Sequence, residues 1–336
     1  MAALETKTEP TPESALAALF AQLRAGLPGS WLLSARNEAM ARLQRDGLPH
    51  RRIEAWKYTD FRNKIGSAAL IPATAGALGE SLFADLKAHR VGIVDGRTTA
   101  VPNADALPDG VEIMALADAL AMPSLWLRQW LQPTENPIEN LNLAFASDGA
   151  LIRVGKGVQV STPVLLHVST GKGMAHIRHV IALEENAELT LVEVDNGGAE
   201  SLGTSVLSLA LERGARLRHL RVTANAAGGI IARSDNVDVA RDASYRGIVL
   251  SSGAALARQQ TSAKLSGEGG AYALACAYAT GEAEHTDFTA EITHEAPNTN
   301  SRIVAKGVAA GTGHGVVQGR VVVKSQAQKT DSHQIA

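Results

Sequence analysis

The chain is poor in cysteine and in aromatic residues. Its 336 residues include one cysteine, Cys276, and aromatic side chains make up only 4% of the total. A single cysteine excludes an internal disulfide and cannot build a four-cysteine metal site within one chain. Alanine, valine, leucine and glycine dominate instead. Such small side chains would fill a narrow interior between closely stacked layers of backbone.

The net charge is small, and long apolar runs are absent. The formal net charge is −2, so no basic excess is available to neutralise a nucleic-acid backbone. There is no stretch of 18 consecutive apolar residues, and we expect no transmembrane helix. Residues 1–14 contain three glutamates and no apolar segment, unlike a secretory signal peptide. We therefore expect a cytoplasmic protein that binds neither nucleic acid nor membrane.

What the chain does have is a repeat. Ala187, Ala215, Ala243 and Ala271 are spaced 28 residues apart, and each follows a turn and precedes an alternating run. A fixed period in this range is typical of stacked repeat architectures. Strands average about 5–6 residues, so each unit can hold two or three strands with their turns, as in one coil of a parallel β-helix. A β-sandwich would not explain three equal steps.

Two domains are predicted. Residues 1–145 have the pattern of a small helical or α+β domain, with helices expected over 15–23, 31–43 and 124–131. From residue 146 onward the apolar pattern has period two, and turn residues recur at intervals too short for helices. Residues 146–336 are therefore predicted to form the β-helix core, which makes the fold mainly β.

Residues suited to ligand chemistry are few. His176 and His179 lie three apart on a predicted strand, so their side chains should point to opposite faces. Cys276 lies among small apolar residues, as an inert core thiol would. His285 and His294 flank a polar strand at a spacing that matches no common metal motif. Cys276, His285 and His294 are the candidate metal ligands; we predict no catalytic residue, and no cofactor bound by this chain alone.

A cluster of carboxylates supports an alternative interpretation. Glu282, Glu284, Asp287, Glu291 and Glu295 lie close together in the sequence. Sugar-active β-helix enzymes need neighbouring carboxylates on an outer face, although a solvated face also explains such a cluster. The alternative function is a polysaccharide-active β-helix enzyme, against which the absence of a secretion signal counts.

Two motifs resemble a known family. Residues 52–59, R-I-E-A-W-K-Y-T, resemble the R-x-E-x-W-K-Y-T stretch of the SufB/SufD family, and of its SufD branch in particular. Residues 294–301, H-E-A-P-N-T-N-S, begin the second motif, which continues through 306–308, 319–323 and 327–334. This series resembles the family's H-x-x-P-x-T-x-S…K-G-V…G-[RK]-[IV]-x-V…A-Q-K-T-[DN]-x-x-Q pattern. Both motifs occur in the family's order, and the similarity covers nearly the whole chain.

The resemblance implies a fold and a function. Members have a right-handed parallel β-helix between helical domains, and they assemble iron–sulfur clusters. A SufD-like subunit is expected to be a non-catalytic scaffold that pairs with a SufB-like subunit and supports a SufC-like ATPase and iron delivery. A cluster is expected only in the assembled complex, and a homodimer when the partner is absent. SufB members usually carry more cysteines, so the single Cys276 favours the SufD branch.

The chain departs from the family pattern after Gln334. Members continue into a helical domain with a Cys-Ser-His-Gly motif, so we expect a C-terminally truncated chain without this domain, and no cluster ligand is carried over. Residues 52–59, which we name the Trp56 motif, are expected to pack the N-terminal domain against the neighbouring domain. The residues expected at the partner interface belong to the second motif: Pro297, Thr299, Ser301, Lys306, Lys329, Thr330 and Asp331.

Overall fold

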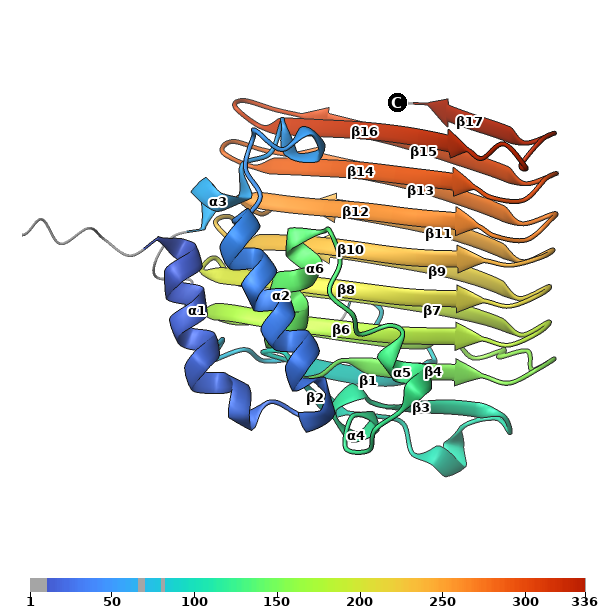
Figure 1. Cartoon of the computed structure of the whole chain (residues 1–336), viewed down its shortest axis with the longest axis horizontal. Helices are drawn as coiled ribbons and strands as arrows, with labels where there is room; N and C mark the ends of the chain where they lie inside the picture. The colour runs from blue at the N-terminus through green and yellow to red at the C-terminus, as the bar shows by residue number, and fades with distance from the viewer. Residues whose placement is uncertain (1–10, 66–69, 80–81, 336) are drawn as a thin grey trace, which may run out of the picture.

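The computed structural model describes residues 11–65, 70–79 and 82–335 and forms a parallel β-solenoid flanked by helices (Figure 1). Two sheets make up the solenoid, and the described residues form about seven coils that each give one strand to each sheet. The nine-stranded sheet has the order β17 (Asp331–Ile335), β15 (Asn300–Ala309), β13 (Ala271–Thr280), β11 (Ser244–Ser252), β9 (Arg216–Ala224), β7 (Glu188–Gly197), β5 (Val164–Thr170), β1 (His89–Val94) and β2 (Arg97–Ala100). The eight-stranded sheet has the order β16 (His314–Val323), β14 (His285–His294), β12 (Leu256–Leu265), β10 (Ile230–Val239), β8 (Ser201–Leu211), β6 (Gly173–Leu183), β4 (Ala150–Val154) and β3 (Val111–Ala115). The predicted parallel β-helix is confirmed, with two strands per coil.

The 28-residue spacing is confirmed, but it is not uniform. Arg216 pairs with Ser244 of the next coil, a step of 28 residues, whereas Ser244 pairs with Ala271, a step of 27. Ala271 therefore pairs with Ser244 and lies one position beyond the stack of buried alanines at 187, 215 and 243. Gly270 closes the corresponding turn, donating its N–H to the Gly267 carbonyl over 3.1 Å.

The turns that precede the stacked alanines share one backbone requirement. Asn186, Gly214 and Asp242 have φ values of 60°, 70° and 56°. Glycine, asparagine and aspartate are the residues that enter this left-handed region at least cost. These residue types at this spacing therefore set the turn along the edge of the solenoid.

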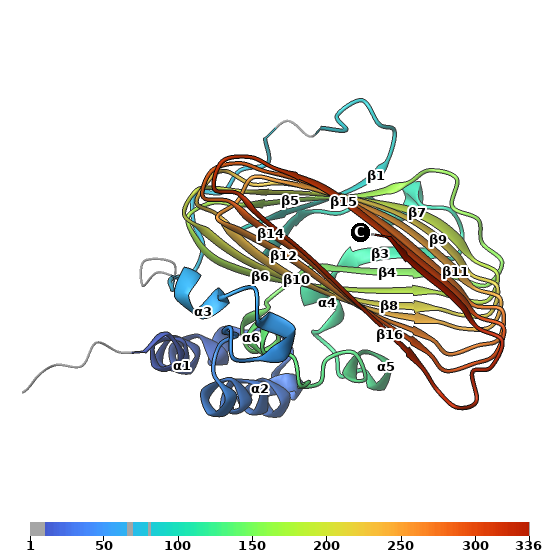
Figure 2. The ribbon, with the colours of Figure 1, turned by 90° about the horizontal axis from the view of Figure 1, so that it is seen from above.

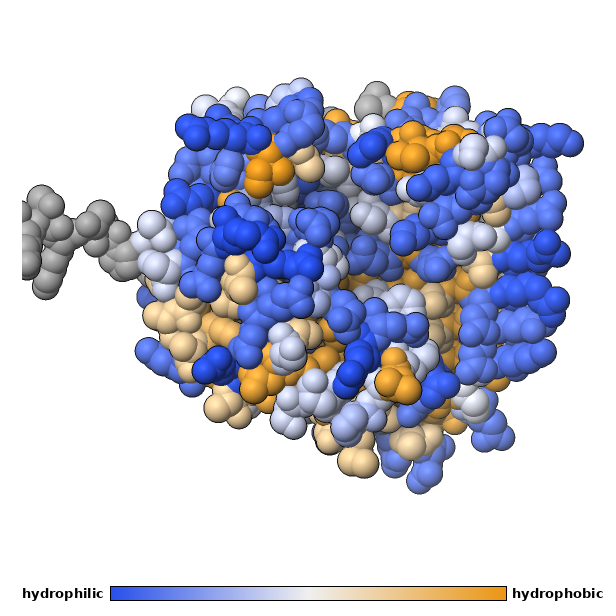
Figure 3. Space-filling view, in the orientation of Figure 1, coloured by the Kyte–Doolittle hydropathy of each residue, from blue (hydrophilic) through white to orange (hydrophobic). Residues whose placement is uncertain are grey.

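This turn edge carries charges of opposite sign in neighbouring coils. Ion pairs join Arg153 to Glu184 over 3.3 Å and Arg241 to Glu268 over 3.2 Å, and Arg213 pairs with Glu185. Figure 3 shows the edge, on the right of the view, as a largely hydrophilic border. Solvated charge pairs thus cover the turn edge, where strands of the eight-stranded sheet are followed by strands of the nine-stranded sheet.

The helices cover the outer face of the eight-stranded sheet (Figure 2). They are α1 (Pro12–Leu23), α2 (Leu33–Asp46), α3 (Phe61–Lys64), α4 (Leu116–Ala119), α5 (Leu125–Arg128) and α6 (Pro137–Phe145). The helices predicted over 15–23, 31–43 and 124–131 correspond to α1, α2 and α5. An apolar cluster that includes Phe20, Met40 and Phe145 packs these helices against Leu202 and Ile230 of the sheet. Among the described residues, none of the helices has the length and apolar character needed to cross a membrane.

The segment before the solenoid also contributes strands. β1 pairs in parallel with β5, and β3 pairs antiparallel with β4. Both sheets therefore begin within residues 1–145, ahead of the first complete coil.

Candidate functional site

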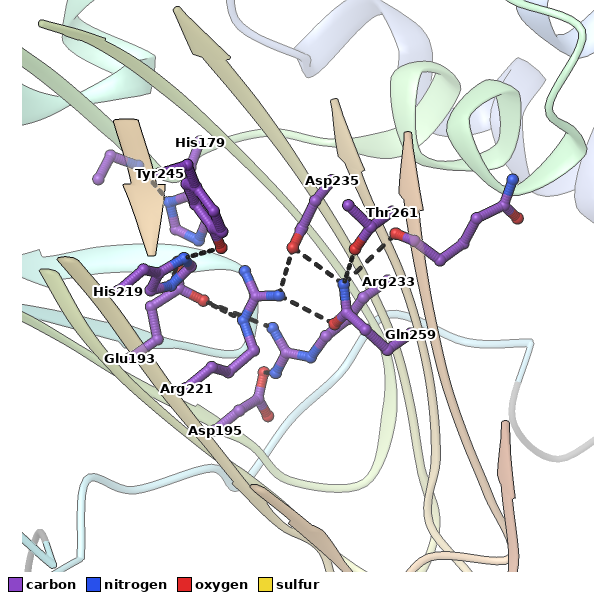
Figure 4. Close-up of polar contacts among 12 residues, drawn as sticks. His179, Glu193, Asp195, His219, Arg221, Arg233, Asp235, Tyr245, Gln259 and Thr261 are labelled. Carbon is purple, nitrogen blue, oxygen red and sulfur yellow. Dashed lines mark hydrogen bonds and ion pairs between the residues drawn. The ribbon is translucent and has the colours of Figure 1, made fainter. Parts of the chain in front are cut away.

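A charged network lies inside the solenoid, between the two sheets (Figure 4). Arg221 of β9 is its centre. Its Nε donates to Glu193 Oε2 over 2.6 Å, and one terminal nitrogen donates to Asp235 Oδ2 over 2.7 Å and to Gln259 Oε1 over 2.9 Å. Glu193 belongs to the nine-stranded sheet, whereas Asp235 and Gln259 belong to the eight-stranded sheet. The network is therefore a polar brace across the interior.

A second ion pair extends the brace. Arg233 pairs with Asp195, and it lies 3.9 Å from Glu193 Oε2. His219 places Nε2 3.3 Å from Glu193 Oε1 and Nδ1 3.0 Å from the hydroxyl of Tyr245. All of these groups are buried, so each charge depends on its neighbours rather than on water.

Burial and pairing act in opposite directions on the carboxylates. Burial by itself would raise the pKa of Glu193, but Arg221 and His219 hold that pKa well below its usual range. Burial raises the pKa of Asp195 in spite of its partner Arg233. Because guanidinium groups lie among the carboxylates, the interior is built for mutual neutralisation. Among the described residues, no group of three His, Cys, Asp or Glu side chains could hold a metal ion.

The alternation of each strand explains where the network lies. On β9 the inward side chains are Leu217, His219 and Arg221, which become polar with distance from the turn edge. Across the interior, β10 runs from Asp235 to Val237 and Val239 toward that same edge. The coil formed by β9 and β10 therefore has an apolar half next to the turns and a charged half farther along.

The Trp56 motif packs the N-terminal segment onto the outer face of the eight-stranded sheet. The indole of Trp56 is buried, and the guanidinium of Arg258 lies 3.8 Å from its ring centroid. Arg258 donates to the Ala55 carbonyl over 2.8 Å and pairs with Asp287. The hydroxyl of Thr59 also donates to Asp287. The motif thus docks the N-terminal segment onto β12 and β14, as a packing role requires.

We expect Thr59→Val to loosen this contact by about 2 kcal/mol, because it removes a hydrogen bond to a buried charged group at nearly constant volume. Hydrogen exchange of amides within residues 48–65 would measure the change. Lys57→Met is the control, because the ion pair of Lys57 with Glu54 is exposed and should contribute less than about 1 kcal/mol. Equal protection in both variants would contradict a docking role for Thr59.

The second motif forms a hydroxyl-lined corner around His294. Nδ1 of His294 lies 2.7 Å from Thr299 Oγ1, and Nε2 lies 2.9 Å from Ser301 Oγ. The next coil repeats the two hydroxyl side chains, with Thr330 3.2 Å from Thr299 and Ser332 2.9 Å from Ser301. The spacing H-x-x-x-x-T-x-S therefore places both hydroxyls on one buried imidazole, and burial lowers the pKa of His294.

The three candidate metal ligands lie in different places. Cys276 is in the apolar interior, where burial raises its thiol pKa to about 12. His285 faces outward, with Nε2 2.9 Å from Thr59 Oγ1, and burial lowers its pKa to about 4. His294 is in the corner described above. His176 and His179 take opposite faces as predicted: His176 stacks on Phe145 outside the sheet, and His179 accepts from the Ala150 N–H.

The residues expected at a partner interface divide into two groups. Thr299 and Ser301 are buried, and Pro297 and Thr330 are half-buried. The three exposed members are Lys306, Lys329 and Asp331.

The acidic run does not gather into a pair of free carboxylates. Asp287 is paired with Arg258, Glu291 lies 3.4 Å from Arg320, and Glu284 accepts from the Gly281 N–H over 2.7 Å. These contacts give the three carboxylates structural partners, and they do not favour a glycosidase arrangement.

The last described coil exposes side chains that would be core residues elsewhere. Phe288 of β14 is buried in the interior, and its neighbour in β16 is Val317, which is 36% exposed. His294 is buried, and its neighbour Val323 is 51% exposed. Within the described residues, β16 and β17 each pair on one side only.

Fold and site together define a class of protein: a parallel β-solenoid with a mutually neutralised interior (Figure 4). Residues 166–336 match the family model "SUF system FeS cluster assembly, SufBD core domain", and the chain belongs to this family. It is 27% identical to the iron-sulfur cluster assembly protein SufD of Escherichia coli K12 over 306 residues, covering 87% of this chain and 70% of that protein. It is 28% identical to the iron-sulfur cluster assembly protein SufB of Bacillus subtilis over 185 residues, covering 53% of this chain and 39% of that one.

Proposed function

We propose that this chain is a non-catalytic, SufD-like scaffold subunit of a cytoplasmic SUF-type iron–sulfur assembly complex. In that complex it pairs with a SufB-like subunit and supports a SufC-like ATPase and iron delivery. The observation that carries the proposal is the position of the family match, because residues 166–336 hold the solenoid from β5 onward. The cluster is cargo of the complex, and no cluster ligand is assigned to this chain.

The edge strand β16 of the described residues supports pairing through the solenoid. An unpaired strand edge presents free backbone N–H and C=O groups to a partner strand. The inward row of β16 adds apolar surface beside that edge, because Val317, Val321 and Val323 continue the core rows of β14. A partner solenoid stacked on the last described coil would bury that row and extend both sheets.

Co-purification with a SufB-like subunit under reducing conditions tests the pairing. We expect Val317→Asp to reduce recovery of the complex at least tenfold, because the buried interface would then hold an unpaired charge. Val308→Asp is the matched control, since Val308 is 70% exposed on β15 and points to the outer face. Full recovery with Val317→Asp, or no complex with the parent chain, would contradict the proposal.

The same surface predicts self-association when the partner is absent. Sedimentation of the purified chain should show a concentration-dependent dimer, and Val317→Asp should shift it to monomer. A dimer that persists unchanged in this variant would place self-association on another surface.

A further inference from the structure

Three arginines form a row on the outer face of the nine-stranded sheet. Arg218 of β9 is in register with Arg246 of β11, which is in register with Ala273 of β13 and then with Arg302 of β15. All three arginines are exposed, and within the described residues none of them has an ion pair or a side-chain hydrogen bond. We name this set the arginine row.

The arginine row differs from the other charges of the solenoid surface. Two residues before Arg218 on the same strand, Arg216 pairs with Glu188 of the neighbouring coil over 2.8 Å. Ion pairs also join neighbouring coils along the turn edge and between β14 and β16. Like charges on adjacent strands are destabilising, so the arginine row costs stability in the isolated chain. Such a cost is typical of residues kept for binding.

An apolar row runs beside the arginines. Leu220, Ile248 and Val304 lie two residues further along the same strands, and Ile248 is 50% exposed. We name these three residues the apolar row. The arginine row and the apolar row together line a groove with a volume of about 420 Å³. The groove crosses the strands, and one wall is basic while its floor is apolar.

The same sheet face is already covered in the earlier coils. Phe83, Leu86 and Ala88, from the segment before β1, pack over Leu165 and Val192. Figure 2 shows this segment on the side of the solenoid opposite the helices. Leu220 is the last member of the row in contact with that cluster, and the row then continues uncovered through Ile248. The segment before β1 therefore packs on the outer face of the nine-stranded sheet over β5 and β7. The uncovered surface around Ile248 continues that apolar face.

We propose that the arginine row and the apolar row bind an amphipathic helical segment of another protein, with carboxylates toward the arginines and large apolar side chains toward Ile248. Neighbouring strands are about 4.8 Å apart, so Arg218 and Arg246 are separated by about one helical turn and Arg246 and Arg302 by about two. Carboxylates three or four residues apart, followed by one about seven residues further, match this spacing on a helix lying across the strands.

Charge selects a protein segment over the other anionic partners. Nucleic acid and anionic membranes are bound through many basic contacts over a wide surface, and this chain carries a net charge of −2. Three arginines beside an apolar floor suit a short acidic segment with apolar anchors. This inference is independent of the family assignment and of pairing through β16.

Selection from a displayed library of helical peptides of about 20 residues, with the full chain as target, tests the proposal. Arg218→Gln/Arg246→Gln serves for counter-selection, and fluorescence anisotropy of an enriched peptide gives Kd. We expect enriched peptides to carry Asp or Glu at the stated spacing beside Leu, Ile or Phe. We expect Kd to rise about tenfold in the double variant, since two charge pairs are lost. Arg241→Gln, an exposed arginine at the turn edge, should leave Kd within about twofold.

Other outcomes would overturn the proposal. One is a library that yields no acidic peptides, or peptides that bind the double variant equally well. Another is Arg218-dependent binding of phosphatidylglycerol vesicles or of single-stranded RNA, tested as separate probes, without peptide binding. A third is a lower Tm of the double variant, because removing unpaired like charges from a binding surface should leave Tm unchanged or raise it.

Discussion

Arg221→Leu is expected to destabilise the folded protein by about 3–5 kcal/mol, because it leaves buried carboxylates without their counter-ion. Arg221 bonds Glu193 on one sheet and Asp235 on the other. Leucine fills part of the space but neutralises neither carboxylate, and neither can reach water from the interior. Urea unfolding followed by circular dichroism would measure the loss as a lower midpoint at unchanged slope.

Arg216→Leu is the matched control for this prediction. Arg216 lies on the same strand and pairs with Glu188 in the neighbouring coil, as Arg221 does with Glu193, but the Arg216 pair is exposed. Exposed pairs contribute about 0–1 kcal/mol. Equal losses in the two variants would show that burial does not determine the effect and would contradict the brace. A triple variant with Glu193→Gln, Arg221→Leu and Asp235→Asn should recover part of the loss, because it removes all three charges together.

The brace was not predictable from the sequence, although its strands were. Glu193 and Arg221 are 28 residues apart, but Asp235 lies on the opposite sheet. The period-two pattern predicts which residues share a face of one strand, not which strand faces it across the interior. One signal was present: the inward positions of the two strands change from leucine near the turn to Glu193 and Arg221 at the same distance from it.

The Trp56 motif also shows that contacts between distant segments could not be predicted from the sequence. The sequence predicted that the Trp56 motif packs the N-terminal domain, and the structure places it on Arg258 and Asp287, about 200 residues away. Nothing local indicates those partners. Helix α6 was not predicted, although Asn136 followed by Pro137 is a sequence signal for the start of a helix. In the structure the Asn136 side chain accepts a hydrogen bond from the Ile138 N–H over 3.0 Å.

Acidification from pH 6.5 to pH 5 is expected to lower the free energy of unfolding by about 3 kcal/mol through two buried histidines. Burial lowers the pKa of His176 to about 3 and that of His179 to about 4, against an ordinary value of 6.5. Between these values and 6.5, the unfolded chain binds a proton at each histidine and the folded chain does not. Stability therefore falls as pH falls, by about 1 kcal/mol per pH unit for each histidine over this range, because the unfolded histidine is only half protonated at pH 6.5.

His176→Gln isolates one of the two contributions, because the imidazole packs on Phe145 and its Nδ1 lies 2.7 Å from Thr204 Oγ1, a contact that glutamine can replace in part. The variant starts from a lower stability at pH 7.5, but its decrease between pH 6.5 and pH 5 should be shallower than that of the parent by about 1 kcal/mol per pH unit. Asp195, whose raised pKa acts in the opposite direction, is present in both chains and cancels from the difference. Urea unfolding at pH 7.5, 6.5 and 5 in one buffer of constant ionic strength gives the two slopes. Parallel slopes would contradict the prediction, since they would mean that His176 is protonated equally in the folded and unfolded chains and is not held neutral against the helices.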